Sequence, residues 1–192
     1  IPEAIHMPLE QAFDGFIDDK SVDMLMIELE NTKYDAVLAG CGLGNRKTTA
    51  DLTEIVLRTA DCPVILDADG LNSIARNINV LKESKNSVVI TPHPAEFARL
   101  TGKKVAEIQA DRLSCAKSFA KEYNCVVVLK GVNTVIAAPS GETFINTTGS
   151  PGLAKGGSGD VLAGMIASFA AQGVKPFYAA ALAVYLHGLA AD

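Results

Sequence analysis

The stretch Cys125-Val126-Val127-Val128-Leu129 places five apolar residues in succession immediately before Lys130-Gly131. A strand with one face in water would alternate apolar and polar residues, so this unbroken run predicts a strand that is covered on both faces. Shorter apolar runs occur earlier, at residues 36–39, 63–66 and 87–90, and each leads into a loop rich in Gly, Pro, Asp or Asn. The alternation of such runs with helical patterns predicts βαβ units and a mostly parallel sheet.

The pattern changes after residue 129. Thr134-Val135-Ile136-Ala137-Ala138 and Thr143-Phe144-Ile145 flank the turn residues Pro139-Ser140-Gly141-Glu142, which predicts an antiparallel hairpin. We expect this hairpin at the edge of the parallel sheet. The predicted fold class is therefore α/β, with the sheet covered by helices on both faces.

Four helical patterns accompany the predicted strands. Residues 49–59 form the first, and residues 105–123 form a long second pattern with apolar residues at helical spacing. A third pattern carries Val161, Leu162, Met165, Ile166 and Phe169 and stops at Gly173. The last begins after Pro176, a residue typical of the first turn of a helix.

The composition excludes several classes of protein. The chain has 192 residues, 48% of them hydrophobic, and a net charge of −5 from 17 basic and 22 acidic residues. This balance gives no electrostatic basis for binding nucleic acid or an anionic membrane, and no apolar stretch is long enough to span a bilayer. The four cysteines and three histidines lack the spacing of a zinc site or a disulfide framework, so we expect reduced thiols, a cytoplasmic protein and no protein ligands to a metal.

Polar residues follow one predicted strand after another. Ligands of open parallel sheets bind outside the carboxyl ends of the strands, so these residues are expected to share one rim. The residues are Gly42 and Gly44 after the first strand, Asp67, Asp69 and Asn72 after the second, His93 and Glu96 after the third, Lys130 after the fourth, and Asp160 beyond the hairpin.

The strongest motif is Lys155-Gly156-Gly157-Ser158-Gly159-Asp160, which opens a helix. Glycines let backbone N–H groups turn towards an anion, and the helix N-terminus adds partial positive charge, so the motif predicts a phosphate cradle. Asp160 alone could be an ordinary first-turn acid, but beside such a cradle it is placed to take a proton from a hydroxyl. The segment is neither a Walker A loop nor a G-x-S-x-G elbow, because the required Gly-Lys-Ser/Thr and final glycine are missing.

Two further strand ends carry candidates with simpler alternatives. His93 stands between Pro92 and Pro94, which restrict the backbone and favour a positioned side chain, although a lone histidine is commonly structural. Lys130 ends a buried strand, where its charge requires water or a partner such as phosphate. His6, His187 and all four cysteines are interpreted as structural.

Five sequence blocks together resemble a known family. They are Gly40-Cys41-Gly42-Leu43-Gly44, Asp67-Ala68-Asp69-Gly70-Leu71-Asn72, Thr91-Pro92-His93-Pro94-Ala95-Glu96-Phe97, Lys130-Gly131-Val132-Asn133-Thr134, and the glycine-rich block from Ser150 to Gly164. In this order they closely resemble the ADP/ATP-dependent NAD(P)H-hydrate dehydratases, a branch of the ribokinase-like superfamily. The resemblance implies a ribokinase-like three-layer α/β/α sandwich.

The resemblance also implies a metabolite-repair lyase. Such an enzyme dehydrates the 6-hydroxy form of NADH or NADPH, coupled to hydrolysis of ADP or ATP, with Mg²⁺ bridging the phosphates. Asp160 would be the catalytic base. The substrate contacts would be Gly44, Asp69, Asn72, His93, Glu96 and Asp160, and the nucleotide contacts would be Lys130, Gly131, Val132, Asn133, Thr134, Gly156, Gly157, Ser158 and Gly159, with the last four forming an anion hole.

One departure from the family pattern is visible. Family members carry a further N-terminal segment with a glycine- and alanine-rich helix and a substrate-contacting alanine, and nothing before Ile1 supplies it. We expect residues 1–192 to form a single ribokinase-like domain that lacks this segment, and we expect a homo-oligomer. Two other functions stay open: a vitamin-precursor kinase of the same fold, and a nucleotide-binding module without catalysis.

Overall fold

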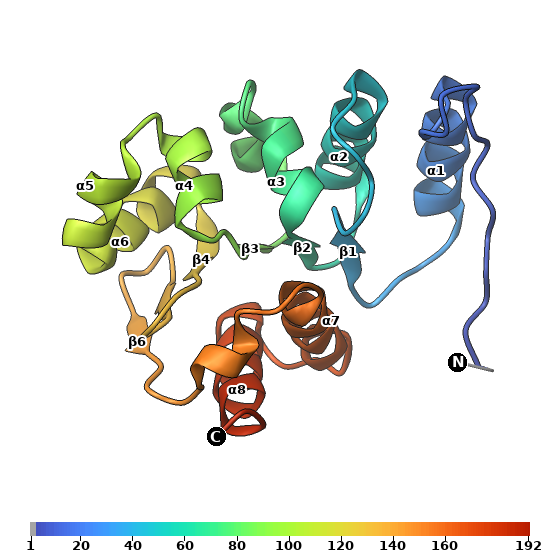
Figure 1. The fold of residues 1–192 in the computed structure, drawn as a ribbon. Helices are drawn as coiled ribbons and strands as arrows, with labels where there is room; N and C mark the ends of the chain where they lie inside the picture. The colour runs from blue at the N-terminus through green and yellow to red at the C-terminus, as the bar shows by residue number, and fades with distance from the viewer. Residues whose placement is uncertain (1–2) are drawn as a thin grey trace.

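A computed structural model describes residues 3–192 and contains one six-stranded sheet (Figure 1). The strands lie in the order of the sequence: β1 (Val37–Ala39), β2 (Val64–Leu66), β3 (Val88–Ile90), β4 (Cys125–Leu129), β5 (Val135–Ala137) and β6 (Thr143–Ile145). The strands β1 to β4 are parallel, whereas β5 pairs antiparallel with both β4 and β6. The predicted parallel sheet with an antiparallel hairpin at its edge is confirmed.

Helices cover both faces of the sheet (Figure 1). Figure 1 shows α1 to α6 above the sheet and α7 and α8 below it, which is the predicted three-layer arrangement. The upper layer contains α1 (Asp19–Asn31), α2 (Lys47–Thr59), α3 (Ala68–Ile74), α4 (Pro94–Thr101), α5 (Val105–Ala110) and α6 (Arg112–Tyr123), with a short 3-10 helix, η1 (Ile78–Glu83). The lower layer contains α7 (Ser158–Ala171) and α8 (Pro176–Leu189), preceded by the 3-10 helix η2 (Pro151–Leu153).

The strands separate two hydrophobic cores. In β2, Val64 and Leu66 belong to the core under the upper helices, whereas Ile65 packs against the core formed with α7 and α8. The same alternation continues in β3, where Val89 faces the lower core. All of these side chains are buried, which explains why the sequence shows continuous apolar runs rather than alternation.

The region expected to form one long helix, residues 105–123, forms two. The break is at Asp111, whose backbone is not helical and whose carboxylate accepts a hydrogen bond from the Ser114 N–H at 3.0 Å. A side chain that caps the following helix in this way competes with continuation of the preceding one. The helix α1 was not predicted from the sequence.

Two segments expected as loops contain helices. Residues 68–74 form α3, which includes Asp69 and Asn72, and Pro94 begins α4 directly after His93. The glycine-rich segment enters α7 at Ser158, so Gly159 and Asp160 lie in the first turn of that helix. Within residues 3–192, no helix has both the length and the apolar character needed to cross a bilayer. The single-domain prediction for residues 1–192 also includes Ile1 and Pro2, which lie outside the described residues.

Candidate active site at the carboxyl edge of the sheet

A cleft of ≈ 880 Å³ opens at the carboxyl ends of the parallel strands. Its lining brings together Asp67 after β2, His93 after β3, Lys130 after β4, and Asp160 from the first turn of α7. The convergence of polar residues on one rim, expected from the sequence, therefore occurs for these four. Further predicted residues that line the same cleft are Glu96, Gly131, Val132, Asn133, Thr134, Ser158 and Gly159.

A buried ion pair crosses the floor of this cleft. The Lys130 ammonium lies 2.8 Å from Oδ1 of Asp67 and 4.0 Å from Oε2 of Glu96. The Asp67 and Glu96 side chains are only 2% and 7% exposed, so their charges need a partner, and the 21% exposed Lys130 supplies it. The sequence left open whether Lys130 would meet solvent or a ligand, and it did not indicate Asp67 as its protein partner.

His93 is fixed by the start of α4. Its Nδ1 accepts hydrogen bonds from the N–H groups of Ala95 at 3.1 Å and Glu96 at 3.3 Å, and a Glu96 carboxylate oxygen accepts from the His93 N–H at 2.8 Å. Because Nδ1 is an acceptor, the neutral ring carries its proton on Nε2, which lies 3.3 Å from Oε1 of Glu96. The ring is a helix cap that still presents a half-exposed edge to the cleft.

Three possible metal ligands meet beside the glycine-rich segment. The Sγ of Cys41 and carboxylate oxygens of Asp67 and Asp160 lie within 4.8 Å of one another. Burial, followed by a hydrogen bond to Asp160 and the negative charges of Asp160 and Asp67, raises the pKa of the Cys41 thiol to about 11. The thiol is therefore a neutral hydrogen-bond donor at ordinary pH and supports the exposed Asp160 carboxylate. Sequence spacing could not reveal this group because its members come from three separate segments.

The two carboxylates of this group fit Mg²⁺, whereas the thiol does not. Mg²⁺ prefers oxygen ligands and is commonly held by one or two carboxylates together with phosphates. Asp160 is exposed to the cleft, and Asp67 keeps a second carboxylate oxygen beyond the one that binds Lys130. A protonated thiol is a poor ligand for this hard cation, so Cys41 would stay outside its coordination.

The backbone approaches Asp67 and Lys130 closely at two glycines. A Cβ on Gly40 would lie 1.8 Å from the carbonyl oxygen of Asp67, and Gly40 has a φ of +127°. A Cβ on Gly159 would lie 3.3 Å from the Lys130 ammonium and 3.5 Å from Asp67. The first glycine lets Asp67 stand beside β1, and the second brings the first turn of α7 against the ion pair.

The first turn of α7 offers backbone N–H groups to the cleft. The Ser158 N–H donates to the Lys155 carbonyl at 3.2 Å and is engaged in a turn. The next N–H groups, of Gly159 and Asp160, belong to the positions that have no acceptor within a helix, and the helix dipole adds positive potential there. Free N–H groups at a helix N-terminus can bind an anion, and the anion hole of residues 156–159 stays a prediction. Gly156 and Gly157 lie in the turn just before α7, with Gly157 at a φ of +86°.

Three predicted substrate contacts lie outside the lining of the cleft. The Gly44 N–H donates to a carboxylate oxygen of Asp69 at 2.8 Å, which ties the β1–α2 loop to α3. Asn72 accepts a hydrogen bond from Arg99 at 2.7 Å. The structure thus pairs Gly44 with Asp69 and holds Asn72 separately.

A second wall of the cleft was not predicted from the sequence. Residues 146–149, Pro151 and Ala154 line it, and so does His187 from α8, which was interpreted as structural. Nε2 of His187 lies 3.4 Å from the Ser158 hydroxyl, and burial lowers the pKa of its ring. The available signal was topological: β6 runs parallel to β4, so the residue after it, Asn146, returns to the same rim.

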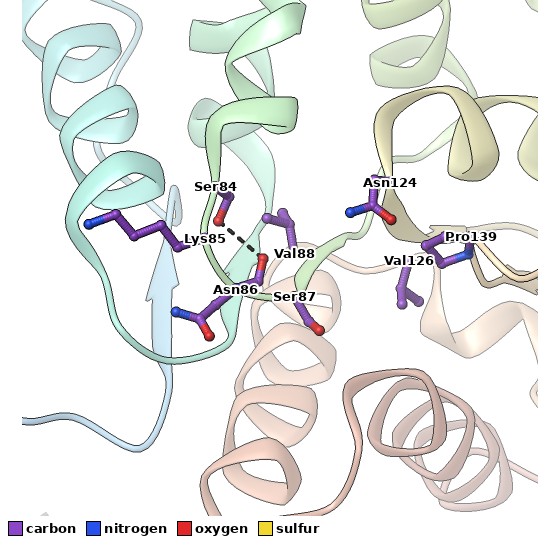
Figure 2. A pocket seen from close by; sticks show the side chains of 8 residues that line it. All are labelled: Ser84, Lys85, Asn86, Ser87, Val88, Asn124, Val126 and Pro139. Atoms are coloured by element: carbon purple, nitrogen blue, oxygen red, sulfur yellow. Dashed lines mark hydrogen bonds between the residues drawn. The ribbon is translucent and has the colours of Figure 1, made fainter.

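A second pocket, of ≈ 220 Å³, lies at the opposite edge of the sheet (Figure 2). It is formed by the segments that enter β3 and β4 together with Pro139 after β5, and Figure 2 shows the Ser84 hydroxyl donating to the Asn86 carbonyl in its wall. Lys85 is the charged residue of its lining, which contains no carboxylate or histidine. The chemistry of the described residues is concentrated in the larger cleft.

Comparisons with known proteins agree with the resemblance seen in the sequence. Residues 2–192 match the family model described as NAD(P)H-hydrate dehydratase. The chain is 44% identical over 190 residues to the bifunctional NAD(P)H-hydrate repair enzyme of Moorella thermoacetica, covering 99% of this chain and 36% of that protein. It is 46% identical to the ADP-dependent (S)-NAD(P)H-hydrate dehydratase of Neisseria meningitidis, covering 82% of this chain and 54% of that one.

A solved structure shares the fold and much of the sequence. The ADP/ATP-dependent NAD(P)H-hydrate dehydratase of Bacillus subtilis, co-crystallised with ATP and Mg²⁺, matches with a TM-score of 0.74 and 39% identity, covering 88% of this chain and 58% of that one. The chain thus spans only about a third, 36%, of the length of the bifunctional relative from Moorella. The family-model match extends over nearly all of residues 1–192 and includes the cleft, its glycine-rich turn and the carboxylate pair, which places this chain in the NAD(P)H-hydrate dehydratase family.

Proposed function

We propose that this protein dehydrates the 6-hydroxy adduct of NADH or NADPH in a reaction coupled to hydrolysis of ADP or ATP. The observation that carries the proposal is the position of Asp160, an exposed carboxylate in the first turn of α7, next to the N–H groups of an anion-binding helix terminus. A base beside a phosphate cradle suits phosphoryl transfer to a hydroxyl. The family membership supports this substrate class.

The nucleotide and the hydrated cofactor would occupy different parts of the cleft. Residues 130–134 and the second wall, which includes Pro151 and His187, would hold the adenine nucleotide, with its phosphates directed at residues 156–159. The hydrated nicotinamide would lie towards His93, Glu96 and the Gly44–Asp69 contact, with Asn72 further away. Asp160 lies in the first turn of α7, where the two regions meet.

The proposed reaction has two stages. Asp160 accepts the proton of the 6-hydroxyl while the hydroxyl oxygen attacks the terminal phosphorus of the nucleotide. The bond from that phosphorus to the bridging oxygen breaks, which releases AMP from ADP or ADP from ATP. The ring nitrogen lone pair then expels phosphate from C6, and loss of a proton from C5 restores the ring double bond. Phosphorylation is needed because hydroxide is a poor leaving group.

The protein groups would stabilise the charges of this reaction. The N–H groups at the start of α7 would stabilise negative charge on the transferring phosphoryl group, and Lys130 lies close to Gly159. Mg²⁺, held by Asp160 and Asp67, would neutralise phosphate charge when bound. A homo-oligomeric assembly and a cytoplasmic location are also part of the proposal, the latter supported by the free thiols of all four cysteines.

Purified protein incubated with hydrated NADH, Mg²⁺ and either ADP or ATP tests the proposal. We expect the absorbance of reduced nicotinamide to return, with one inorganic phosphate released for each NADH formed. A stable phosphorylated product would instead indicate a small-molecule kinase. Nucleotide binding without either product would indicate a binding module and would contradict the proposed activity.

A further inference from the structure

The loop between β4 and β5, residues 130–134, is held by hydrogen bonds from an arginine of another element. Arg112 is the first residue of α6, and its Nη2 donates to the Leu129 carbonyl at 2.5 Å. Its Nη1 donates to the Val132 carbonyl at 2.5 Å, with the Asn133 carbonyl at 3.4 Å. One planar guanidinium therefore spans the loop from the end of β4 to the residues that precede β5.

The shape of the loop depends on this guanidinium. Gly131 has a φ of +143°, and a Cβ there would lie 3.0 Å from Nη2 and 3.2 Å from Cζ of Arg112. Asn133 is also left-handed, with a φ of +57°. Positive φ angles turn the carbonyl groups at both ends of this short loop towards the same guanidinium. The conformation of the loop and the position of Arg112 therefore depend on each other.

The arrangement is costly for a purely structural arginine. The recorded acceptors of Arg112 are backbone carbonyls, and its buried Nε has no hydrogen-bond partner among residues 3–192. Burial lowers the pKa of this guanidinium. Such a cost is typical of residues that hold functional backbone in a defined conformation.

The gripped loop contributes directly to the cleft. Lys130, at its start, forms the ion pair with Asp67, and residues 131–134 line the cleft, whereas Arg112 is not among the lining residues. The Thr134 hydroxyl donates to the Gly131 carbonyl at 2.9 Å, which closes the loop across its own ends. Arg112 thus fixes, from behind, which backbone and side-chain groups face the cleft.

We propose that Arg112 is a positioning residue for the adenine nucleotide: its guanidinium holds residues 130–134 in the conformation that binds it. The inference rests on the proposed function, in which this loop contacts the nucleotide. Arg112 itself makes no contact with the ligand. Its contribution comes from the fork geometry of the guanidinium, which can bond two carbonyls at once, rather than from charge alone.

The matched variants are Arg112→Ala, Arg112→Lys and, as a control on the exposed face of α6, Lys117→Ala. Isothermal titration calorimetry with ADP and with ATP should show Kd raised about tenfold or more by Arg112→Ala, the effect of losing hydrogen bonds made by a charged group. Arg112→Lys should lose most of the same affinity, because one ammonium group cannot bond the two carbonyls in the geometry of the guanidinium. Lys117→Ala should bind as the parent protein does.

Amide hydrogen exchange provides a readout that does not depend on the ligand. Exchange in residues 130–134 should rise in both Arg112 variants while β3 stays protected, since a general loss of stability would affect both regions. Gly131→Ala perturbs the same contact from the loop side and should also weaken ADP binding, which keeps the test open if Arg112→Ala does not fold.

The outcomes separate the two proposals. Parental affinity in Arg112→Ala, complete rescue by Arg112→Lys, or unchanged loop exchange would each overturn the role of Arg112. A parent protein that binds neither ADP nor ATP would instead refute the proposed function, and the nucleotide role of Arg112 with it. Increased loop exchange in the variants would then still demonstrate the grip on the loop itself.

Discussion

The ammonium of Lys130 lies 2.8 Å from a carboxylate oxygen of Asp67, and the Asp67 side chain is only 2% exposed. The two residues follow different strands, β4 and β2, with β3 between them. The pair therefore links the ends of two strands that are not neighbours in the sheet.

Asp67→Asn should destabilise the fold markedly. It leaves the Lys130 ammonium without its nearest charge partner in a largely buried position, which typically costs about 3 kcal/mol of unfolding free energy. Urea denaturation would measure the change. Asp51→Asn is a suitable control because it removes the carboxylate from an exposed lysine–aspartate pair with Lys47, and it should cost less than about 1 kcal/mol. Equal losses in the two variants would contradict the structural importance of the buried pair.

Asp160→Asn should lower turnover by about 10²–10⁴-fold, the usual contribution of a positioned general base. The amide keeps the size of the carboxylate but cannot accept the proton, so the affinity for ADP or ATP measured without Mg²⁺ should change little. Steady-state kinetics and calorimetry would separate these effects. Asp35→Asn, at an exposed position just before β1, should leave both unchanged. Parental turnover in Asp160→Asn would remove Asp160 from the mechanism.

Cys41 should react slowly with iodoacetamide in the folded protein. Its pKa of about 11 lies above the ordinary value of 9.0, so at pH 8 the thiolate fraction falls about 100-fold. Asp160 stabilises the protonated thiol, so Asp160→Asn should lower the pKa and speed the reaction. Mass spectrometry of the Cys41 peptide over a pH series would follow it, with urea-unfolded protein as the reference. Equal rates in folded and unfolded protein would contradict the raised pKa.

Alanine substitutions at two glycines of α7 should have different effects, a gain in stability at one and a loss of turnover at the other. Gly164→Ala places a Cβ in open space within a helix and should stabilise the protein by about 0.5–1 kcal/mol. Gly159→Ala places its Cβ 3.3 Å from the Lys130 ammonium and should reduce turnover about tenfold by displacing it from the cleft. Thermal unfolding and kinetics on both variants would test this. Full activity in Gly159→Ala would show that the close approach is dispensable.

The sequence predicted the layers of this fold better than its connections. The apolar runs gave β2, β3 and β4 to within one residue because strands buried on both faces leave an unmistakable pattern. The break at Asp111 and the helix α3 depend on local capping and on tertiary contacts, such as the Ser73 hydroxyl with Thr53 at 3.1 Å. Hydrophobic periodicity carries no information about these contacts.

The location of the candidate site residues at one edge of the sheet was predictable from the sequence, but the contacts between them were not. Placing polar residues after parallel strands correctly grouped Asp67, His93, Lys130 and Asp160. The pairing of Lys130 with Asp67, the thiol next to Asp160 and the grip of Arg112 on its loop join residues that are distant in the sequence. Such pairings follow from the packed geometry and from the cost of leaving buried charges unpaired.

The hairpin of β5 and β6 has a consequence for how the cleft is encoded. Because the chain leaves the rim at Thr134 and returns to it at Asn146, most of the residues proposed to hold the nucleotide come from the uninterrupted segment 130–154. Asp160, by contrast, belongs to the helix that follows. Under the proposed function, that segment can be exchanged between relatives as a cassette that carries nucleotide preference, provided that the arginine at position 112 travels with it, while the catalytic helix is left untouched.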